Sequence, residues 1–449
     1  MELSLRDLQA CFEGVVPSVI ATVAADGTPN VSYLSHVVCV DDEHVALSNQ
    51  FFSKTAANIR ANAQATILIV DAITGAQYTL DVTFEQTLIE GQLFEKVAAH
   101  LRAASTQTGM ANVMRLRGID VYRVNGLRMV PSPAERTAAE PRRSAQMAQV
   151  ADIAMAIAAE TDLGSAIDTT FQRLNEVFGF AHVLILIHDK PSGRLVTLGS
   201  RGYGQTGVGS EVPLGEGVIG ICASERRPVC VADMSRMRRL DEAIRISLAP
   251  ENQTRIIALP GLGKAMSQMA VPMVVQKGLR GVVFVESLER MAFGADAEAA
   301  LAIVASQLGA TLAMIERVSV ETGIEATRPS PQMQAVDAAA EIFRVTHYPF
   351  DDSIFINNEY VIKGVAGRLL LHLLTVFRDE GRRDFSNREL RLDERLRLPD
   401  LKDNLETRLL LLRRRLAEKA LPVQIQRSGR GQIRLDPVGS PILTTALGT

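Results

Sequence analysis

Two proline-containing segments without apolar periodicity interrupt the 449-residue chain, and they constrain its fold more than any other feature. The first, 130–144, carries prolines among small and charged residues, and the second, 321–331, follows a long helical pattern and ends in Pro329 and Pro331. Segments of this composition mark linkers, and about 150 residues per domain is a common prior. We therefore predict three domains, which cover residues 1–130, 146–320 and 351–437, with linkers at 131–145 and 321–350 and a tail at 438–449.

The composition argues against several classes of protein. A hydrophobic share of 47% and a charged share of 22% are typical of ordinary globular cores. The chain has no run of about eighteen apolar residues and no apolar region after Met1, so we expect neither a membrane span nor a secretory signal, and we place the chain in the cytoplasm. The cysteines, Cys11, Cys39, Cys222 and Cys230, form no Cys-x-x-Cys pair, so we predict reduced thiols and no metal site.

A basic helix followed by a hairpin is predicted near the C-terminus. Four leucines recur at helical spacing and give the helix one apolar face: Leu405, Leu409, Leu412 and Leu416. From residue 423 to residue 435 apolar and polar residues alternate on either side of a Gly-x-Gly turn, which is typical of a hairpin. Residues 401–437 hold nine Lys/Arg and four Asp/Glu in a chain of net charge -3. Positive charge is therefore concentrated where phosphate would lie.

Two further helices are predicted upstream, over 364–374 and 386–390, the second with Ser386 as its cap and Glu389 three residues later. This order of three helices and a hairpin resembles the winged-helix output domain of bacterial transcription regulators, over residues 352–437. The resemblance implies DNA as a partner, and phosphate contact is safer to predict than base readout. The candidate DNA-binding residues are Arg408, Arg413, Arg414, Arg415, Arg427, Arg430 and Arg434. The alternative is a basic, solvated face that binds protein or nothing.

The first domain is predicted to consist mainly of strands. They are predicted at 18–23 and 30–35 around the turn Asp26-Gly27-Thr28-Pro29, and at 44–48 and 65–71 on either side of a helix at 54–60. This pattern resembles the pyridoxamine-phosphate-oxidase-like, FMN-binding split barrel, over residues 8–130. The resemblance implies that FMN or a related flavin is bound.

In that family the flavin phosphate lies near the start of the helix, where exposed N–H groups favour an anion. The resemblance therefore implies Ser53, Lys54 and Thr55 as phosphate ligands, with Asn58 nearby. Ser48 occupies the strand end where many flavin binders supply an arginine or lysine. The alternative is a degenerate scaffold or dimerisation module in which Ser53 and Thr55 cap the helix and Lys54 is solvated.

Helices and strands alternate in the middle of the chain. Helices are predicted at 146–159 and 167–178, and strands at 182–189, 268–273 and 281–286. Together with the loop Pro213-Leu214-Gly215-Glu216-Gly217 and the strand Ala270-Val271-Pro272-Met273, this order resembles a GAF domain over residues 146–318. The resemblance implies a pocket for a small-molecule effector, of a chemistry that the sequence does not name, between the sheet and a lid at 237–267.

Three residues are candidates for that pocket: His182, Cys222 and Cys230. His182 and His188 share one face of a strand, but six residues at about 3.3 Å each separate them too widely for one metal ion. The two thiols are candidates for redox sensing. The alternative is that they pack in the core.

The predicted fold class is multidomain α+β, with an N-terminal split β-barrel, a central α/β/α GAF sandwich and a C-terminal winged helix. This architecture indicates a cytoplasmic ligand- or redox-responsive transcriptional regulator, in which the first two domains control DNA binding by the third. The alternative is a flavin-dependent oxidoreductase of the pyridoxamine-phosphate-oxidase-like class with regulatory GAF and winged-helix modules. Whether the chain is an enzyme stays open, and no catalytic residue is assigned.

A homodimer is also expected. The apolar helix at 299–318 is predicted to pack with the helix at 147–157, either across a two-fold axis or within one chain. Across a two-fold axis, the two winged helices would read two half-sites.

Overall fold

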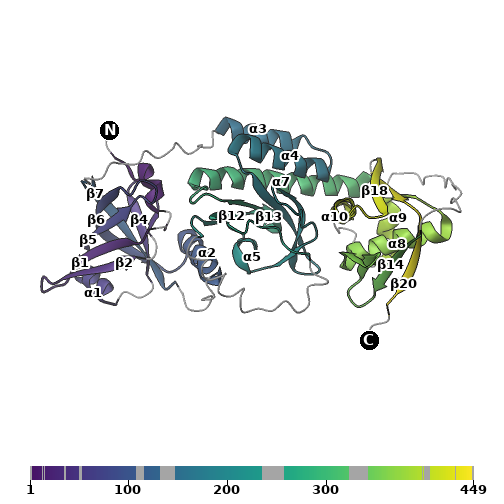
Figure 1. The fold of residues 1–449 in the computed structure, drawn as a ribbon. Helices are drawn as coiled ribbons and strands as arrows, with labels where there is room; N and C mark the ends of the chain where they lie inside the picture. The colour runs from purple at the N-terminus through teal and green to yellow at the C-terminus, as the bar shows by residue number, and fades with distance from the viewer. Residues whose placement is uncertain are drawn as a thin grey trace.

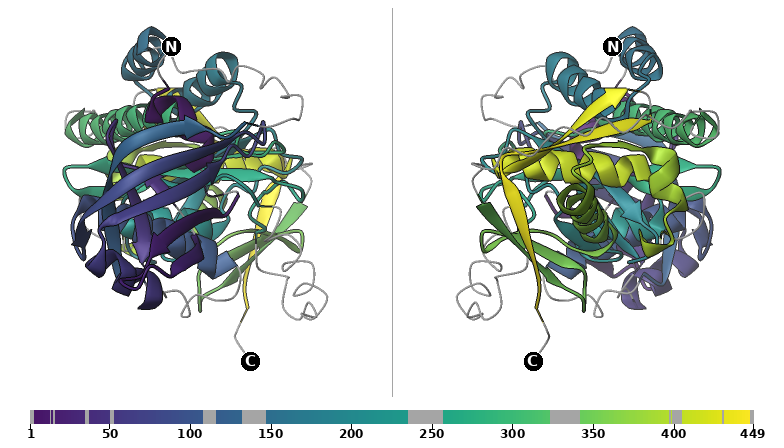
Figure 2. Two further views of the ribbon diagram at one scale, coloured as in Figure 1. Left: turned by 90° about the vertical axis from the view of Figure 1, so that its left-hand side faces the viewer. Right: turned by 90° about the vertical axis from the view of Figure 1, so that its right-hand side faces the viewer.

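The protein consists of three domains that follow one another in chain order, as the computed structural model shows (Figures 1 and 2). The structure describes residues 3–12, 14, 16–34, 37–49, 53–107, 116–131, 147–234, 257–322, 342–396, 398, 405–429 and 431–446. The N-terminal domain lies at one end, the central domain in the middle and the C-terminal domain at the other end (Figure 1).

The N-terminal domain is a curved, seven-stranded sheet in the order β2-β1-β5-β6-β7-β4-β3. Its strands alternate inward and outward residues, as in β5, where Ile67 and Ile69 are fully buried between partly exposed neighbours. The sheet wraps around a core that includes Ile20, Leu80 and Tyr122. The elements are η1 (Leu5–Phe12), β1 (Ser18–Val23), β2 (Pro29–Leu34), β3 (Val37–Cys39), β4 (His44–Asn49), α1 (Ser53–Ala61), β5 (Gln64–Val70), β6 (Gln77–Leu88), α2 (Gln92–Gln107) and β7 (Gly118–Met129).

The central domain is a six-stranded antiparallel sheet, in the order β10-β9-β8-β13-β12-β11, between two helical layers. Residues of β8 point alternately to the two layers: Ile185 packs with α3, α4 and α7, whereas Leu184 and Leu186 pack with α5. The elements are α3 (Met147–Ala158), α4 (Leu163–Phe178), β8 (His182–Asp189), β9 (Arg194–Arg201), β10 (Glu211–Pro213), α5 (Gly217–Glu225), β11 (Val229–Val231), β12 (Ser267–Val275), β13 (Gly278–Ser287) and α7 (Ala295–Thr322).

Helix α7 is long and apolar enough to cross a membrane by length and composition, with a mean hydropathy of 1.6 over Ala295–Val318. The core helix of a globular domain passes the same test. Leu301, Val304 and Leu308 are fully buried where α7 packs on β12, α3 and α4. We therefore describe α7 as the main core helix of the central domain.

The C-terminal domain places three helices between two small sheets, of strand order β16-β15-β14-β20 and β17-β19-β18. Ser386 caps α9 and accepts a hydrogen bond from the backbone N–H of Glu389 at 3.2 Å, so this predicted cap is confirmed. The elements are β14 (Ile342–Tyr348), β15 (Ser353–Ile356), β16 (Glu359–Ile362), α8 (Gly364–Glu380), β17 (Asp384–Ser386), α9 (Asn387–Leu392), η3 (Glu394–Leu396), α10 (Leu405–Glu418), β18 (Val423–Gly429), β19 (Gln432–Pro437) and β20 (Ser440–Thr445).

Strands β14 and β20 lie in ranges that the sequence pattern assigned to a linker and a tail. They form a parallel pair, with Ile342 opposite Ser440 and His347 opposite Thr445. Phe343 and Val345 of β14 are buried in the domain core, which explains why this pair is ordered. The pairing joins residues almost one hundred positions apart, so no local pattern predicts it.

Candidate functional sites

Helix α1 of the N-terminal domain is fastened to the β1–β2 hairpin by side-chain hydrogen bonds. Asn30 donates to the Thr55 hydroxyl at 3.1 Å, whose oxygen lies 2.9 Å from that of Ser32, and Asn58 donates to the Thr22 hydroxyl at 3.0 Å. Thr55 and Asn58 are both 5% exposed. The structure thus brings these two predicted phosphate ligands together, and it also gives both of them partners within the protein.

The other two predicted phosphate ligands lie at the start of α1. Lys54 is exposed, whereas the side chain of Ser53 lies outside the described residues. Lys54 lies close enough to Asp26 that its charge contributes to lowering the pKa of that carboxyl, after the hydrogen bonds from Thr28. This end of the helix therefore presents one solvated cation.

A cavity with an empty volume of about 270 Å³ lies beside α1. The Ser48 hydroxyl that lines it is buried and has no hydrogen-bond partner among the described residues. Tyr122, on the neighbouring strand β7, also lines the cavity, and burial raises the pKa of its hydroxyl. Much of this volume is open to solvent, and the enclosed part holds about one water molecule. Within one chain, the cavity has no room for the ring system of a flavin.

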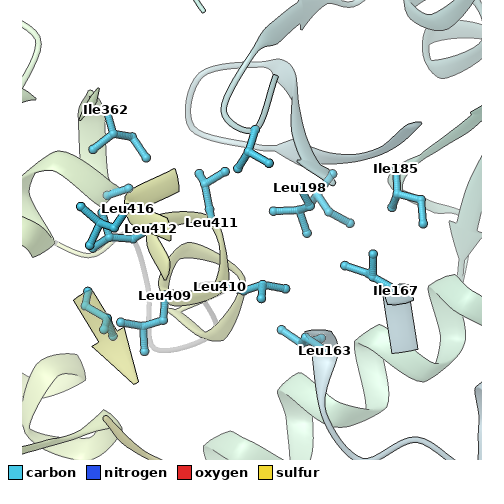
Figure 3. Close-up of a cluster of buried hydrophobic side chains, with 14 of the residues drawn as sticks. Leu163, Ile167, Ile185, Leu198, Ile362, Leu409, Leu410, Leu411, Leu412 and Leu416 are labelled. Carbon is cyan, nitrogen blue, oxygen red and sulfur yellow. The ribbon is translucent and has the colours of Figure 1, made fainter. Parts of the chain in front are cut away.

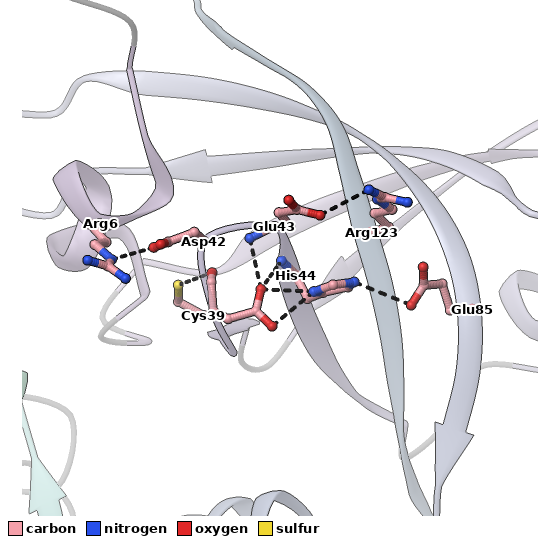
Figure 4. Close-up of polar contacts among 8 residues, drawn as sticks. Arg6, Cys39, Asp42, Glu43, His44, Glu85 and Arg123 are labelled. Carbon is pink, nitrogen blue, oxygen red and sulfur yellow. Dashed lines mark hydrogen bonds and ion pairs between the residues drawn. The ribbon is translucent and has the colours of Figure 1, made fainter.

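A second polar cluster of this domain surrounds His44, the first residue of β4, next to the turn from β3 (Figure 4). His44 Nδ1 lies 2.8 Å from Asp41, and its Nε2 lies 3.4 Å from Glu85 on β6. Arg123 of β7 pairs with Glu43 at 3.0 Å. These contacts fasten the turn to neighbouring strands. In the part of the chain that the structure describes, no group of three His, Cys, Asp or Glu could hold a metal ion.

The three predicted pocket residues of the central domain fall on two sides of its sheet. Cys222 is fully buried on α5, and burial raises the pKa of its thiol well above the usual value, so it is a poor nucleophile. Cys230 packs toward the opposite core, where its Sγ lies 3.6 Å from the Phe293 carbonyl oxygen. The structure therefore does not bring these two cysteines together.

His182 belongs instead to a polar group that the sequence analysis missed. Its ring meets the Tyr203 ring edge-on, with 5.6 Å between centroids, and its charge acts on Glu286. Glu286 is 3% exposed and accepts hydrogen bonds from the Leu262 N–H at 2.6 Å and the Gln268 amide at 3.1 Å. Burial raises the pKa of Glu286. The one sequence signal was a carboxylate at the end of an apolar strand.

The predicted DNA-binding helix α10 lies against the central domain, on α4 and β9. Two ion pairs join α10 to that domain, and a third joins the β18–β19 hairpin to it. We call these three pairs the arginine clasp. The clasp pairs are Arg408 with Asp189 at 3.0 Å, Arg414 with Asp168 at 2.6 Å and Arg427 with Asp162 at 2.5 Å. These three candidate residues therefore contact protein in this conformation.

Apolar side chains of α10 complete this interface (Figure 3). Leu410 and Leu411 point from α10 toward Leu163 of α4 and Leu198 of β9, and all four are less than 10% exposed. The buried apolar residues of the two domains form one continuous cluster. The clasp therefore surrounds a hydrophobic contact and is more than a set of surface ion pairs.

The remaining candidate arginines differ in environment. Arg415 is 5% exposed and donates to the Val361 carbonyl oxygen at 3.0 Å inside its own domain. Arg434 is partly exposed and lies 3.3 Å from Asp436 and 3.4 Å from Asp384. Arg413 lines a cavity of about 410 Å³ at the domain boundary. Arg430 lies outside the described residues.

That boundary cavity is lined by polar groups of both domains. Asp162 and Arg427 face it from the clasp, and Glu406 and Asn387 face it from the C-terminal domain. Asn387 donates a hydrogen bond to Glu406, and burial raises the pKa of the Glu406 carboxyl. Most of these groups thus already have partners across the cavity.

Two family models match the chain. Residues 6–125 match pyridoxamine 5'-phosphate oxidase, and residues 160–313 match the GAF domain. These matches confirm the two resemblances predicted for the N-terminal and central domains. The chain is thus multidomain α+β, with a barrel-like N-terminal sheet and a GAF domain. Neither match extends beyond residue 313, and no curated protein matches the chain.

Solved structures resemble the same two domains. The GAF domain of a phosphoenolpyruvate-protein phosphotransferase from Acinetobacter is 20% identical, covering 38% of this chain and 95% of that one, with a TM-score of 0.32. Free methionine-R-sulfoxide reductase from Neisseria meningitidis is 20% identical over 39% and 96%, with a TM-score of 0.30. An FMN-binding protein from Syntrophomonas wolfei subsp. wolfei is 14% identical over 28% and 87%, with a TM-score of 0.25.

Proposed function

We propose that this chain, which joins a split barrel of the FMN-binding type to a GAF domain, is a cytoplasmic ligand- or redox-responsive transcriptional regulator. In this proposal the C-terminal domain is a winged helix that binds DNA, and the two upstream domains control it. The effector would bind the GAF domain, where the partly exposed rings of His182 and Tyr203 meet edge-on near the buried carboxylate of Glu286.

The observation that carries the proposal is the outer side of α10. Leu405, Leu412 and Leu416 are fully buried on the side that faces the rest of the C-terminal domain. At 100° per residue, Leu410 and Arg414 lie on the opposite side, and the β18–β19 hairpin follows directly. That side thus carries Arg414 beside apolar Leu410, and a helix with an arginine turned away from its own core, followed by a hairpin, fits the way in which a winged helix meets a DNA groove.

The proposal is tested by measuring binding of the full-length protein to the DNA upstream of its own gene. We expect Arg413→Ala/Arg430→Ala to weaken binding about tenfold and to reduce the salt slope by one to two, at about 0.9 per lost phosphate contact. Arg408, Arg414 and Arg427 are left intact because each also pairs with an aspartate of the central domain.

The matched control is Arg60→Ala/Arg173→Ala, which removes the same charge from exposed positions of the other two domains. The control should bind DNA like the wild type. An unchanged affinity and salt slope for Arg413→Ala/Arg430→Ala, or an equal loss in the control, would contradict DNA binding by α10 and the hairpin.

A flavin-dependent oxidoreductase is the second candidate, favoured by the family match of the N-terminal domain. Lys54 at the exposed start of α1 would hold the phosphate of a flavin, since helix N-termini favour anions, and the buried Ser48 hydroxyl lines the cavity beside Thr55. When bound, a flavin would supply hydride transfer. The ring system of the flavin would lie outside the small cavity of one chain.

The flavin candidate is tested by titrating the protein with FMN and recording its visible spectrum and fluorescence. Lys54→Ala should weaken binding about tenfold if that cation holds the phosphate, because an ion pair to phosphate is charge-assisted. Arg60→Ala, at the exposed far end of α1, is the control. If saturating FMN leaves both signals unchanged, the barrel is a scaffold and the oxidoreductase candidate falls.

A further inference from the structure

The central domain presents an acidic face to α10 and the hairpin. Asp162 is the N-cap of α4, Asp168 lies further along the same helix, and Asp189 ends β8. Hydrogen bonds from Ser165 and the charges of Arg427 and Arg413 outweigh burial and hold the pKa of Asp162 below its usual value. This carboxylate therefore stays ionised at neutral pH, opposite the basic side of the C-terminal domain.

Arg414 is held by three oxygen acceptors of the central domain. Its guanidinium donates to the Leu198 carbonyl oxygen at 3.1 Å, to the Gly164 carbonyl oxygen at 3.4 Å and to Asp168 at 2.6 Å. The side chain is 16% exposed. Carboxylate and carbonyl oxygens thus occupy the donors that a phosphate group would need, since guanidinium recognises both anions in the same way.

We propose that the acidic face of the central domain is an autoinhibitory surface, which holds the C-terminal domain closed through the arginine clasp and excludes DNA until the clasp opens. This inference rests on the proposed DNA-binding function. Only the open fraction of the protein can bind DNA in this scheme, so the apparent affinity falls by that fraction.

The structure connects the clasp to the core of the GAF domain. Thr407 of α10 donates to Glu316 near the end of α7 at 2.6 Å, and Glu316 also pairs with Arg280 of β13. Both α7 and β13 pack in the core of the GAF domain. A structural change in that core on effector binding would therefore reach α10 through the contacts of Glu316.

The test uses the full-length variant Asp168→Asn/Asp189→Asn. It removes two clasp carboxylates with little change in shape, and it spares Asp162, whose side chain caps α4 through the Ser165 N–H at 3.0 Å. Loss of that cap would destabilise α4 and confuse the comparison. We expect the variant to bind DNA at least about tenfold more tightly than the wild type, because the open fraction rises.

Removing carboxylates also lowers the general repulsion of DNA, so the control removes the same charge elsewhere on the domain. Glu176→Gln/Glu289→Gln changes two exposed carboxylates that make no ion pair with the C-terminal domain in the described structure. This control should leave DNA affinity within about twofold of the wild type. An equal rise in the control and in the clasp variant would overturn the proposal.

Gly199→Ala of β9 opens the clasp without changing any charge. A Cβ at this position would meet the Arg414 guanidinium, and the Phe171 ring at 3.1 Å would have to shift slightly. Arg414 must then leave the Leu198 carbonyl oxygen. We expect DNA affinity to rise here too, and an unchanged affinity in both opened variants would overturn the proposal.

A second measurement separates failure of the clasp from failure of the DNA-binding function. Fluorophores on unnatural residues at exposed Met155 of α3 and Glu394 of η3 report the distance between the two domains and leave the native cysteines in place. Lower energy transfer in Asp168→Asn/Asp189→Asn than in the wild type supports the clasp. If the domains separate but no form binds DNA, the clasp stands and the proposed function falls. Equal transfer in both proteins overturns the clasp.

Discussion

The arginines between residues 408 and 434 occupy three different environments, although the sequence gives them the same charge. Arg408, Arg414 and Arg427 pair with the central domain, whereas Arg434 stays partly exposed on the hairpin. Arg415 is buried in its own domain because it follows Leu412 by three positions, next to the leucine face. Helical spacing could have indicated this position, whereas a count of charges could not.

Arg415 provides a prediction at this scale. Arg415→Ala should lower the free energy of unfolding by about 2–4 kcal/mol, because the Val361 carbonyl and Glu418, 2.9 Å from the guanidinium, lose a buried donor. The measurement is denaturant unfolding of the full-length protein. Arg434→Ala, at a partly exposed site, should cost less than about 1 kcal/mol. Wild-type stability together with weakened DNA binding in Arg415→Ala would place Arg415 among the DNA contacts instead.

At the scale of elements, the sequence predicts the helices and the hairpin better than their partners. The leucine spacing indicates one apolar side of α10, and Leu405, Leu412 and Leu416 do form it. Leu410 and Leu411 break this period and are buried too, against a domain more than 200 positions upstream. An unbroken run of four leucines was the only sign that α10 has a second buried side.

In the candidate sites, too, the sequence does not predict which distant residues become partners. The resemblance to the FMN-binding split barrel implies Thr55 and Asn58 as ligands, and the structure adds partners on strands that the resemblance does not specify. Glu286 was missed because its burial depends on a loop distant in sequence, which supplies the Leu262 N–H. In α3, Ile153 and Ile157 pack on α7 within one chain, which accounts for their burial, and the homodimer stays a prediction.

At the scale of the whole molecule, the GAF domain contacts both of the other domains, one at each of its two ends. On one side, α2 of the barrel meets α5 and β11, where Arg227 pairs with Glu95 and Arg102 lies 2.7 Å from Glu225. On the other side, the arginine clasp holds α10. The middle domain thus contacts both of its neighbours through charged pairs.

In the proposed scheme one basic surface serves both the clasp and DNA, so the two contacts exclude each other. This exclusion is tested by energy transfer between the labels at Met155 and Glu394 while DNA from upstream of the gene is titrated into the otherwise unaltered protein. Transfer should fall in proportion to the DNA bound, because each bound protein must open. Constant transfer up to saturation with DNA would show that the clasp and DNA do not compete.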